Sequence, residues 1–92
     1  MDEQYAKLRR IVIDWLDDQV HFGEAEDKVT DDEMSFLKNG ILTSLGFVSL
    51  IVHLEDLLRI RIDRKALTRE NFDGLGKIVR YVLAHPDFKG VP

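Results

Sequence analysis

Ser44 is the residue of this sequence that is best placed to do chemistry, because a helix is expected to begin there. A serine at that position can cap the helix with its hydroxyl, which contributes about 1 kcal/mol to helix stability. It can also hold a negatively charged group, such as a phosphodiester, that the free N–H groups and the dipole of the helix favour. Glycines stand at positions 40 and 46, and the apolar residues nearby exceed what a cap requires: Ile41, Leu42, Leu45, Phe47 and Val48. The residues alone leave both roles open.

The usual enzymatic uses of such a serine lack their partners in this sequence. His53 lies nine residues after Ser44, about 13 Å along a helix, so it cannot act as the base for that serine within the helix. The surroundings of Ser44 lack the first glycine of a Gly-x-Ser-x-Gly elbow. The three histidines form no i, i+4 zinc pair, the six acids between Gly23 and Glu33 lack the order of an EF-hand, and there is no cysteine. We therefore expect neither an enzyme nor a metal site.

The elements that must position Ser44 are helical. The spacing of apolar residues predicts an all-α fold, a small up-down bundle of three main helices plus one short helix with a long first loop, in a single domain of residues 1–92. The expected main elements are a helix from Asp2 to about Val20, a loop from Gly23 to about Thr43, a helix from Ser44 to about Leu58, and a last helix from Gly74 to about Ala84.

Shorter features follow from turn and cap residues. Thr30 to Glu33 fits a capping box, which predicts a helical turn from about Asp32 to Leu37. Asp63, Thr68 and Asp73 are the expected caps of two short turns and of the last helix. Ile60 and Ile62 are expected to point inward from an extended connection, and the tail from Asp87 is expected to fray.

Composition narrows the class of protein. Ninety-two residues suffice for one small core, no apolar run is long enough to cross a bilayer, and the N-terminus carries charges where a signal peptide would be apolar. We therefore expect a cytoplasmic monomer that does not bind a membrane. The formal charge of −4 also argues against nucleic acid as a partner, although the residues from Arg59 onward carry a basic surplus that we assign to the solvated side of the last helices.

The segment from Gly40 to Gly46, with Leu50, Leu54-Glu55-Asp56, Ile60 and Ile62 after it, resembles the acyl carrier protein family. In that family an Asp-Ser-Leu stands at the head of the second helix. The segment from Leu67 to Asp73 is similar to the third-helix region of small free-standing carriers, and the resemblance covers nearly the whole chain. Two positions depart from the family pattern: Thr43 replaces the aspartate before the serine, and Ser49 stands where an acid is usual.

The resemblance implies that Ser44 carries 4′-phosphopantetheine through a phosphodiester, and that the arm holds a fatty acyl, aminoacyl or polyketide group as a thioester for fatty acid or secondary metabolite biosynthesis. The implied partners are a phosphopantetheinyl transferase, an acyl- or aminoacyl-activating ligase, and a downstream acyltransferase or synthase. Their implied docking residues are Thr43, Leu45, Val48, Glu55 and Asp56. An implied acyl cavity is lined by Val48, Val52, Ile60, Ile62, Leu67 and Phe72, for which core packing is the alternative role.

The departure at Thr43 has its own implication. Modifying enzymes of this family use the missing aspartate near their magnesium site, so its replacement should weaken attachment of the arm. The alternative to a carrier is a small helical protein–protein interaction module without a prosthetic group, in which Ser44 is only the N-cap of its helix.

Overall fold

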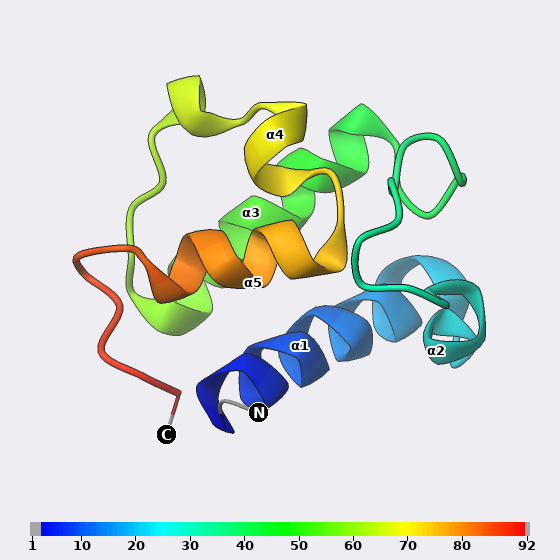
Figure 1. Cartoon of the computed structure of the whole chain (residues 1–92), viewed down its shortest axis with the longest axis horizontal. Coiled ribbons are helices and arrows are strands. Elements are labelled where there is room, and N and C mark those ends of the chain that lie inside the picture. The colour runs from blue at the N-terminus through cyan, green and yellow to red at the C-terminus, as the bar shows by residue number, and fades with distance from the viewer. Residues whose placement is uncertain (1–2, 92) are drawn as a thin grey trace.

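A computed structural model describes residues 3–91 of the chain (Figure 1). These residues contain helices and turns and no strand, which confirms the all-α prediction. The elements are α1 (Glu3–Leu16), a π-helical turn (Asp17–His21), α2 (Ala25–Lys28), α3 (Ser44–Leu58), a 3-10 turn (Arg64–Ala66), α4 (Arg69–Phe72) and α5 (Leu75–Leu83). The bounds of α3 are those expected from the sequence.

The first helix ends differently from the prediction, which extended it to about Val20. Regular α-helix stops at Leu16, and the chain continues as a π-helical turn that ends at Phe22 in the left-handed conformation, with φ 49°. The wider turn directs His21 inward, where its Nε2 donates to the carbonyl oxygen of Ile41 at 2.9 Å. A tertiary hydrogen bond therefore fixes the end of the helix and ties it to the segment just before α3.

The long loop after α1 is ordered by its own acids. It contains α2, which the sequence pattern does not predict. The expected capping box at Thr30 is wrong, as is the helical turn that depended on it. Instead, Asp31 Oδ1 accepts from the N–H of Glu33 at 2.8 Å, and the following residues form non-helical turns. Four apolar side chains of the loop are buried against the bundle: Val29, Phe36, Ile41 and Leu42.

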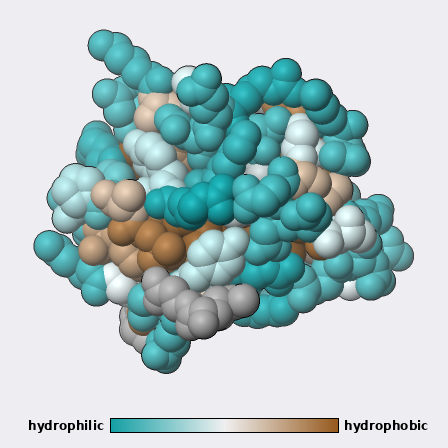
Figure 2. Space-filling view, viewed as in Figure 1, coloured by the Kyte–Doolittle hydropathy of each residue, from teal (hydrophilic) through white to brown (hydrophobic). Residues whose placement is uncertain are grey.

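The core lies between α1, α3 and α5. Leu8 and Leu16 of α1, Leu50 and Leu54 of α3, and Ile78 of α5 are each at most 1% exposed. Figure 1 shows α5 crossing the molecule beside α1, and these two helices are in contact. Figure 2 shows that this face is mostly hydrophilic, with hydrophobic side chains gathered near the C-terminal end of α5.

The connections after α3 match the prediction more closely than the tail does. Ile60 and Ile62 are buried, Asp63 caps the 3-10 turn by accepting from Lys65 N, and Thr68 caps α4. The tail does not fray over its described part, because Val91 N–H donates to Gln4 Oε1 at 2.6 Å. The N-cap position of α5 is Gly74 and not Asp73, whose carboxylate is used elsewhere.

The part of the chain that the structure describes holds neither a candidate membrane span nor a candidate metal site. No helix between residues 3 and 91 combines the length and the apolar character needed to cross a membrane. The same part of the chain has no group of three or more His, Cys, Asp or Glu side chains arranged to hold a metal ion.

Candidate functional site

Thr43, and not Ser44, caps α3. The backbone of Thr43 is extended, and its Oγ1 accepts from the N–H of Gly46 at 3.0 Å. A Cβ on Gly46 would come within 2.9 Å of a Leu42 side-chain carbon and 3.4 Å of Thr43 Oγ1. The side chains of Leu42 and Thr43 therefore occupy the space where a Cβ of residue 46 would lie. This packing explains the glycine without an approaching ligand.

Ser44 is the first residue of α3, and its side chain is exposed. Its hydroxyl makes no hydrogen bond within residues 3–91, because the capping contact belongs to the preceding threonine. Of the two roles that the residues left open for Ser44, the N-cap role is thus wrong, and the alternative in which Ser44 is only the N-cap of its helix loses its structural premise. The hydroxyl faces solvent with no role in holding the fold.

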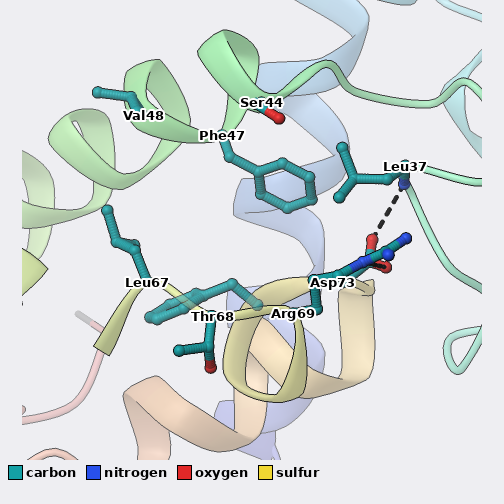
Figure 3. Close-up of a pocket in the computed structure, with 9 residues that line it drawn as sticks. Leu37, Ser44, Phe47, Val48, Leu67, Thr68, Arg69 and Asp73 are labelled. Carbon is teal, nitrogen blue, oxygen red and sulfur yellow. Dashed lines mark hydrogen bonds and ion pairs between the residues drawn. The ribbon is translucent and has the colours of Figure 1, made fainter. Parts of the chain in front are cut away.

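A pocket of about 230 Å³ opens beside Ser44, between the start of α3 and α4 (Figure 3). Figure 3 shows the Phe47 ring and the Leu37 side chain pointing into this space. The lining residues are Leu37, Ser44, Phe47, Val48, Leu67, Thr68, Arg69, Phe72 and Asp73. The pocket therefore combines an apolar lining (Leu37, Phe47, Val48, Leu67 and Phe72) with polar groups at Ser44, Thr68, Arg69 and Asp73.

Three of the six residues that were predicted to line an acyl cavity line this pocket. Val48, Leu67 and Phe72 line it, whereas Ile60 and Ile62 are buried in the core beyond the far end of α3, and Val52 is exposed on its outer face. The other lining residues were not foreseen. Leu37 could not be found from the sequence, because only the docking of the loop brings it next to α3.

Asp73 holds the polar end of the pocket together. Its Oδ2 accepts from Ser35 Oγ at 2.6 Å and lies 3.5 Å from Arg69 Nε, while its Oδ1 accepts from the N–H of Leu37 at 3.0 Å. Burial would raise the pKa of this carboxyl, but the hydrogen bonds from Ser35 and Leu37 and the charge of Arg69 outweigh it, so its pKa lies below the ordinary value. An ionised Asp73 thus fixes the wall of the pocket that the loop supplies.

The outward stripe of α3 consists of Leu45, Val48, Val52 and Asp56, spaced three or four residues apart. Leu45 is 77% exposed, Val48 and Val52 are about 40% exposed, and Asp56 is exposed. Three of the five predicted docking residues, Leu45, Val48 and Asp56, therefore lie on one face of α3, and Thr43 is exposed at the cap before the helix.

Glu55, another predicted docking residue, also lies outside this stripe. Its carboxylate is 16% exposed and accepts from the N–H of Ile62 at 2.8 Å and from Arg64 Nη2 at 3.0 Å. Burial would raise the pKa of Glu55, but these two donors outweigh that effect and lower it. The structure therefore gives Glu55 an internal task, which is to hold the connection after α3.

Comparison with known proteins identifies the family. The chain is 35% identical over 65 residues to the D-alanyl carrier protein of Streptococcus uberis, and the aligned part covers 64% of this chain and 82% of that protein. This chain belongs to the acyl carrier protein family. It is accordingly a carrier protein and not an enzyme. No protein-family model matches the chain. No solved structure matches it either.

Proposed function

We propose that this carrier protein, a single domain of residues 1–92, bears 4′-phosphopantetheine on Ser44 and presents an acyl or aminoacyl group as a thioester to partner enzymes. The observation that carries the proposal is an exposed serine hydroxyl at the first residue of a 15-residue helix, released from capping by Thr43. When bound, the arm supplies a terminal thiol, which this cysteine-free chain lacks.

The start of α3 suits the phosphodiester of that arm. The first N–H groups of a helix have no partner within the helix, and of these the N–H of Gly46 is taken by Thr43 Oγ1. The N–H groups of Ser44 and Leu45 remain for phosphate oxygens, and the helix dipole adds favourable charge there. The prosthetic group therefore fits the residues present without displacing any contact of the fold.

The pocket beside Ser44 offers shelter to part of the cargo. Its apolar wall of Phe47, Leu67 and Phe72 suits a short acyl or side-chain group, and Thr68 and Arg69 place polar groups at its other end. The aminoacyl alternative is supported by the relative in Streptococcus uberis, whose name describes a D-alanyl carrier. We therefore propose aminoacyl groups as well as acyl groups as cargo.

The partners that this function requires are a phosphopantetheinyl transferase, an acyl- or aminoacyl-activating ligase, and a downstream acyltransferase or synthase. We assign their docking to Leu45, Val48, Val52 and Asp56, because this stripe borders Ser44 and joins apolar area to an exposed carboxylate. A monomer suits this role, because successive partners must reach the same face.

The decisive experiment measures the mass of the intact protein after incubation with coenzyme A and a broad-specificity phosphopantetheinyl transferase. We expect an increment of one phosphopantetheine for the wild type and for Ser49→Ala, an exposed serine on the same helix, and none for Ser44→Ala. The absence of an increment in the wild type under forcing enzyme concentrations, or an increment that persists in Ser44→Ala, would show that the proposal is wrong.

A second experiment concerns Thr43. Thr43→Asp restores the carboxylate of the family pattern and should speed modification, while Thr43→Ser retains a neutral cap and should leave the rate unchanged. Aspartate and serine can accept the N–H of Gly46 as Thr43 does, so differences in rate do not arise from loss of the helix. Equal rates for the three proteins would contradict this account of position 43.

A further inference from the structure

A second hollow, whose lining is partly apolar and partly polar, lies on the other side of α3 from Ser44. It has a volume of about 270 Å³ and runs between α1 and α3. Its lining residues are Ile11, Asp14, Trp15, Asp18, Gln19, His53 and Leu57, and we call it the α1–α3 groove. Nothing in the carrier function described above uses it.

The apolar residues of the groove are partly open to solvent. Leu57 is 52% exposed, and Trp15 and Ile11 are half-buried. The rings of Trp15 and His53 face one another with their centroids 6.5 Å apart, so one wall is aromatic. An exposed leucine beside an aromatic wall leaves room for one large apolar side chain of another molecule.

The rim of the groove is acidic. Asp14 and Asp18 lie on it, and no lysine or arginine lines it. Asp14 is 3.3 Å from Arg10 in an exposed pair on the same helix, whereas the carboxylate of Asp18 makes no hydrogen bond or ion pair within the described residues. The rim therefore complements a cationic partner and repels an anionic lipid surface.

The position of the groove makes it independent of the carrier site. His53 lies nine residues after Ser44, which is about two and a half turns, so the two residues are on opposite sides of α3. A partner in the groove would leave Ser44 and the pocket beside it uncovered.

We propose that the α1–α3 groove docks a cationic amphipathic helix of a partner protein, which inserts one apolar side chain beside Trp15 and Leu57 and sets basic residues against Asp14 and Asp18. A groove between two helices favours a third helix as its occupant. A second copy of this chain does not fit as well, because it would bring the same acidic rim toward the first. The site holds the carrier while its Ser44 face stays available to an enzyme.

The test uses the unmodified full chain and a short synthetic helix of leucine and lysine with leucines spaced three and four residues apart. Trp15 is the one tryptophan of the chain, so its fluorescence reports on the groove directly. We expect a saturable change with this peptide that weakens with added salt, and none with a scrambled peptide or with one carrying glutamate in place of lysine.

Two exposed leucines of α3 provide matched variants. Leu57→Ser should weaken binding of the lysine peptide about tenfold, whereas Leu45→Ser, on the Ser44 face, should change it less than about twofold. Asp18→Asn should weaken it about two- to fivefold at low salt. Circular dichroism checks that each variant is folded, which is expected because all three side chains are exposed.

The proposal is overturned by any of three results. These are equal binding of the scrambled or acidic peptide, equal weakening by Leu45→Ser and Leu57→Ser, or concentration-dependent dimerisation that Leu57→Ser abolishes, which would make a second copy the occupant. None of these results depends on whether Ser44 is modified.

Discussion

Replacement of Asp73 by asparagine tests how the pocket wall is held. The carboxylate is 7% exposed and accepts from the Ser35 hydroxyl and the Leu37 N–H, with Arg69 at 3.5 Å. Asparagine has nearly the same shape but only one acceptor oxygen. Its NH2 group would therefore face one of these donors, and the charge that strengthens both hydrogen bonds would be gone.

The magnitude follows from these contacts. A hydrogen bond to a charged group contributes about 1.5–3 kcal/mol, and the exposed Arg69 pair adds about 0–1 kcal/mol. Because the amide retains one acceptor, we expect Asp73→Asn to lower the free energy of unfolding by about 2–4 kcal/mol. For a domain of this size that corresponds to a fall in Tm of roughly 10 °C or more.

The pH dependence has a definite sign. Because the folded pKa of Asp73 lies below its ordinary value of 3.8, the unfolded chain takes up this proton at a higher pH than the folded chain does. The stability that Asp73 contributes is therefore present in full above its unfolded pKa and is lost as the pH falls through its folded pKa. The difference in stability between the wild type and Asp73→Asn should shrink over that acid range.

Urea unfolding of both proteins at neutral pH and at several acid pH values measures these quantities. Asp27→Asn is the control, because that exposed carboxylate has no hydrogen bond or ion pair within the described residues, and we expect a change within about 0.5 kcal/mol. If Asp73→Asn were as stable as Asp27→Asn, or if its deficit persisted unchanged into acid, the assignment of Asp73 as an ionised anchor would be refuted.

Three further predictions concern the same bundle. Thr43→Ala should cost about 1 kcal/mol of unfolding free energy and Thr43→Ser almost nothing, as measured by urea unfolding, because only the alanine lacks the capping oxygen. Gly76→Ala should lower the free energy of unfolding by about 1–3 kcal/mol in the same assay, because the new methyl group would overlap the Glu33 carboxylate. Adding Glu33→Ala to that variant should recover part of the lost stability. Burial, and then the hydrogen bond to Asp32, raise the pKa of Tyr5 to about 12, so ultraviolet titration should show a late tyrosine phase that is absent in Tyr5→Phe. The stability that this phenol contributes should be complete below pH 10.0 and lost as the pH rises through about 12.

Local sequence signals predicted the elements whose stability is mostly local. The bounds of α3 follow from apolar spacing, and the caps at Asp63 and Thr68 follow from side chains that bond to N–H groups two or three residues away. Burial of Ile60 and Ile62 also follows from their alternation with polar residues. These features require no knowledge of which distant segments meet.

The features that the sequence did not predict depend on distant contacts. The π-helical turn before Phe22 is fixed by the hydrogen bond from His21 to Ile41, twenty residues away. By local rules Asp73 should cap α5, but the loop brings Ser35 and Leu37 within reach, and a buried carboxylate with two donors is more stable there.

The cap at the head of α3 bears on how this carrier could change over generations. Threonine, serine, asparagine and aspartate can all supply the oxygen that Gly46 requires, so folding exerts almost no selection among them at position 43. Only molecules that read the surface beside the serine distinguish a neutral residue from a charged one. On the proposal that Ser44 is modified, the residue at position 43 can therefore be selected by the modifying enzyme alone, independently of the scaffold.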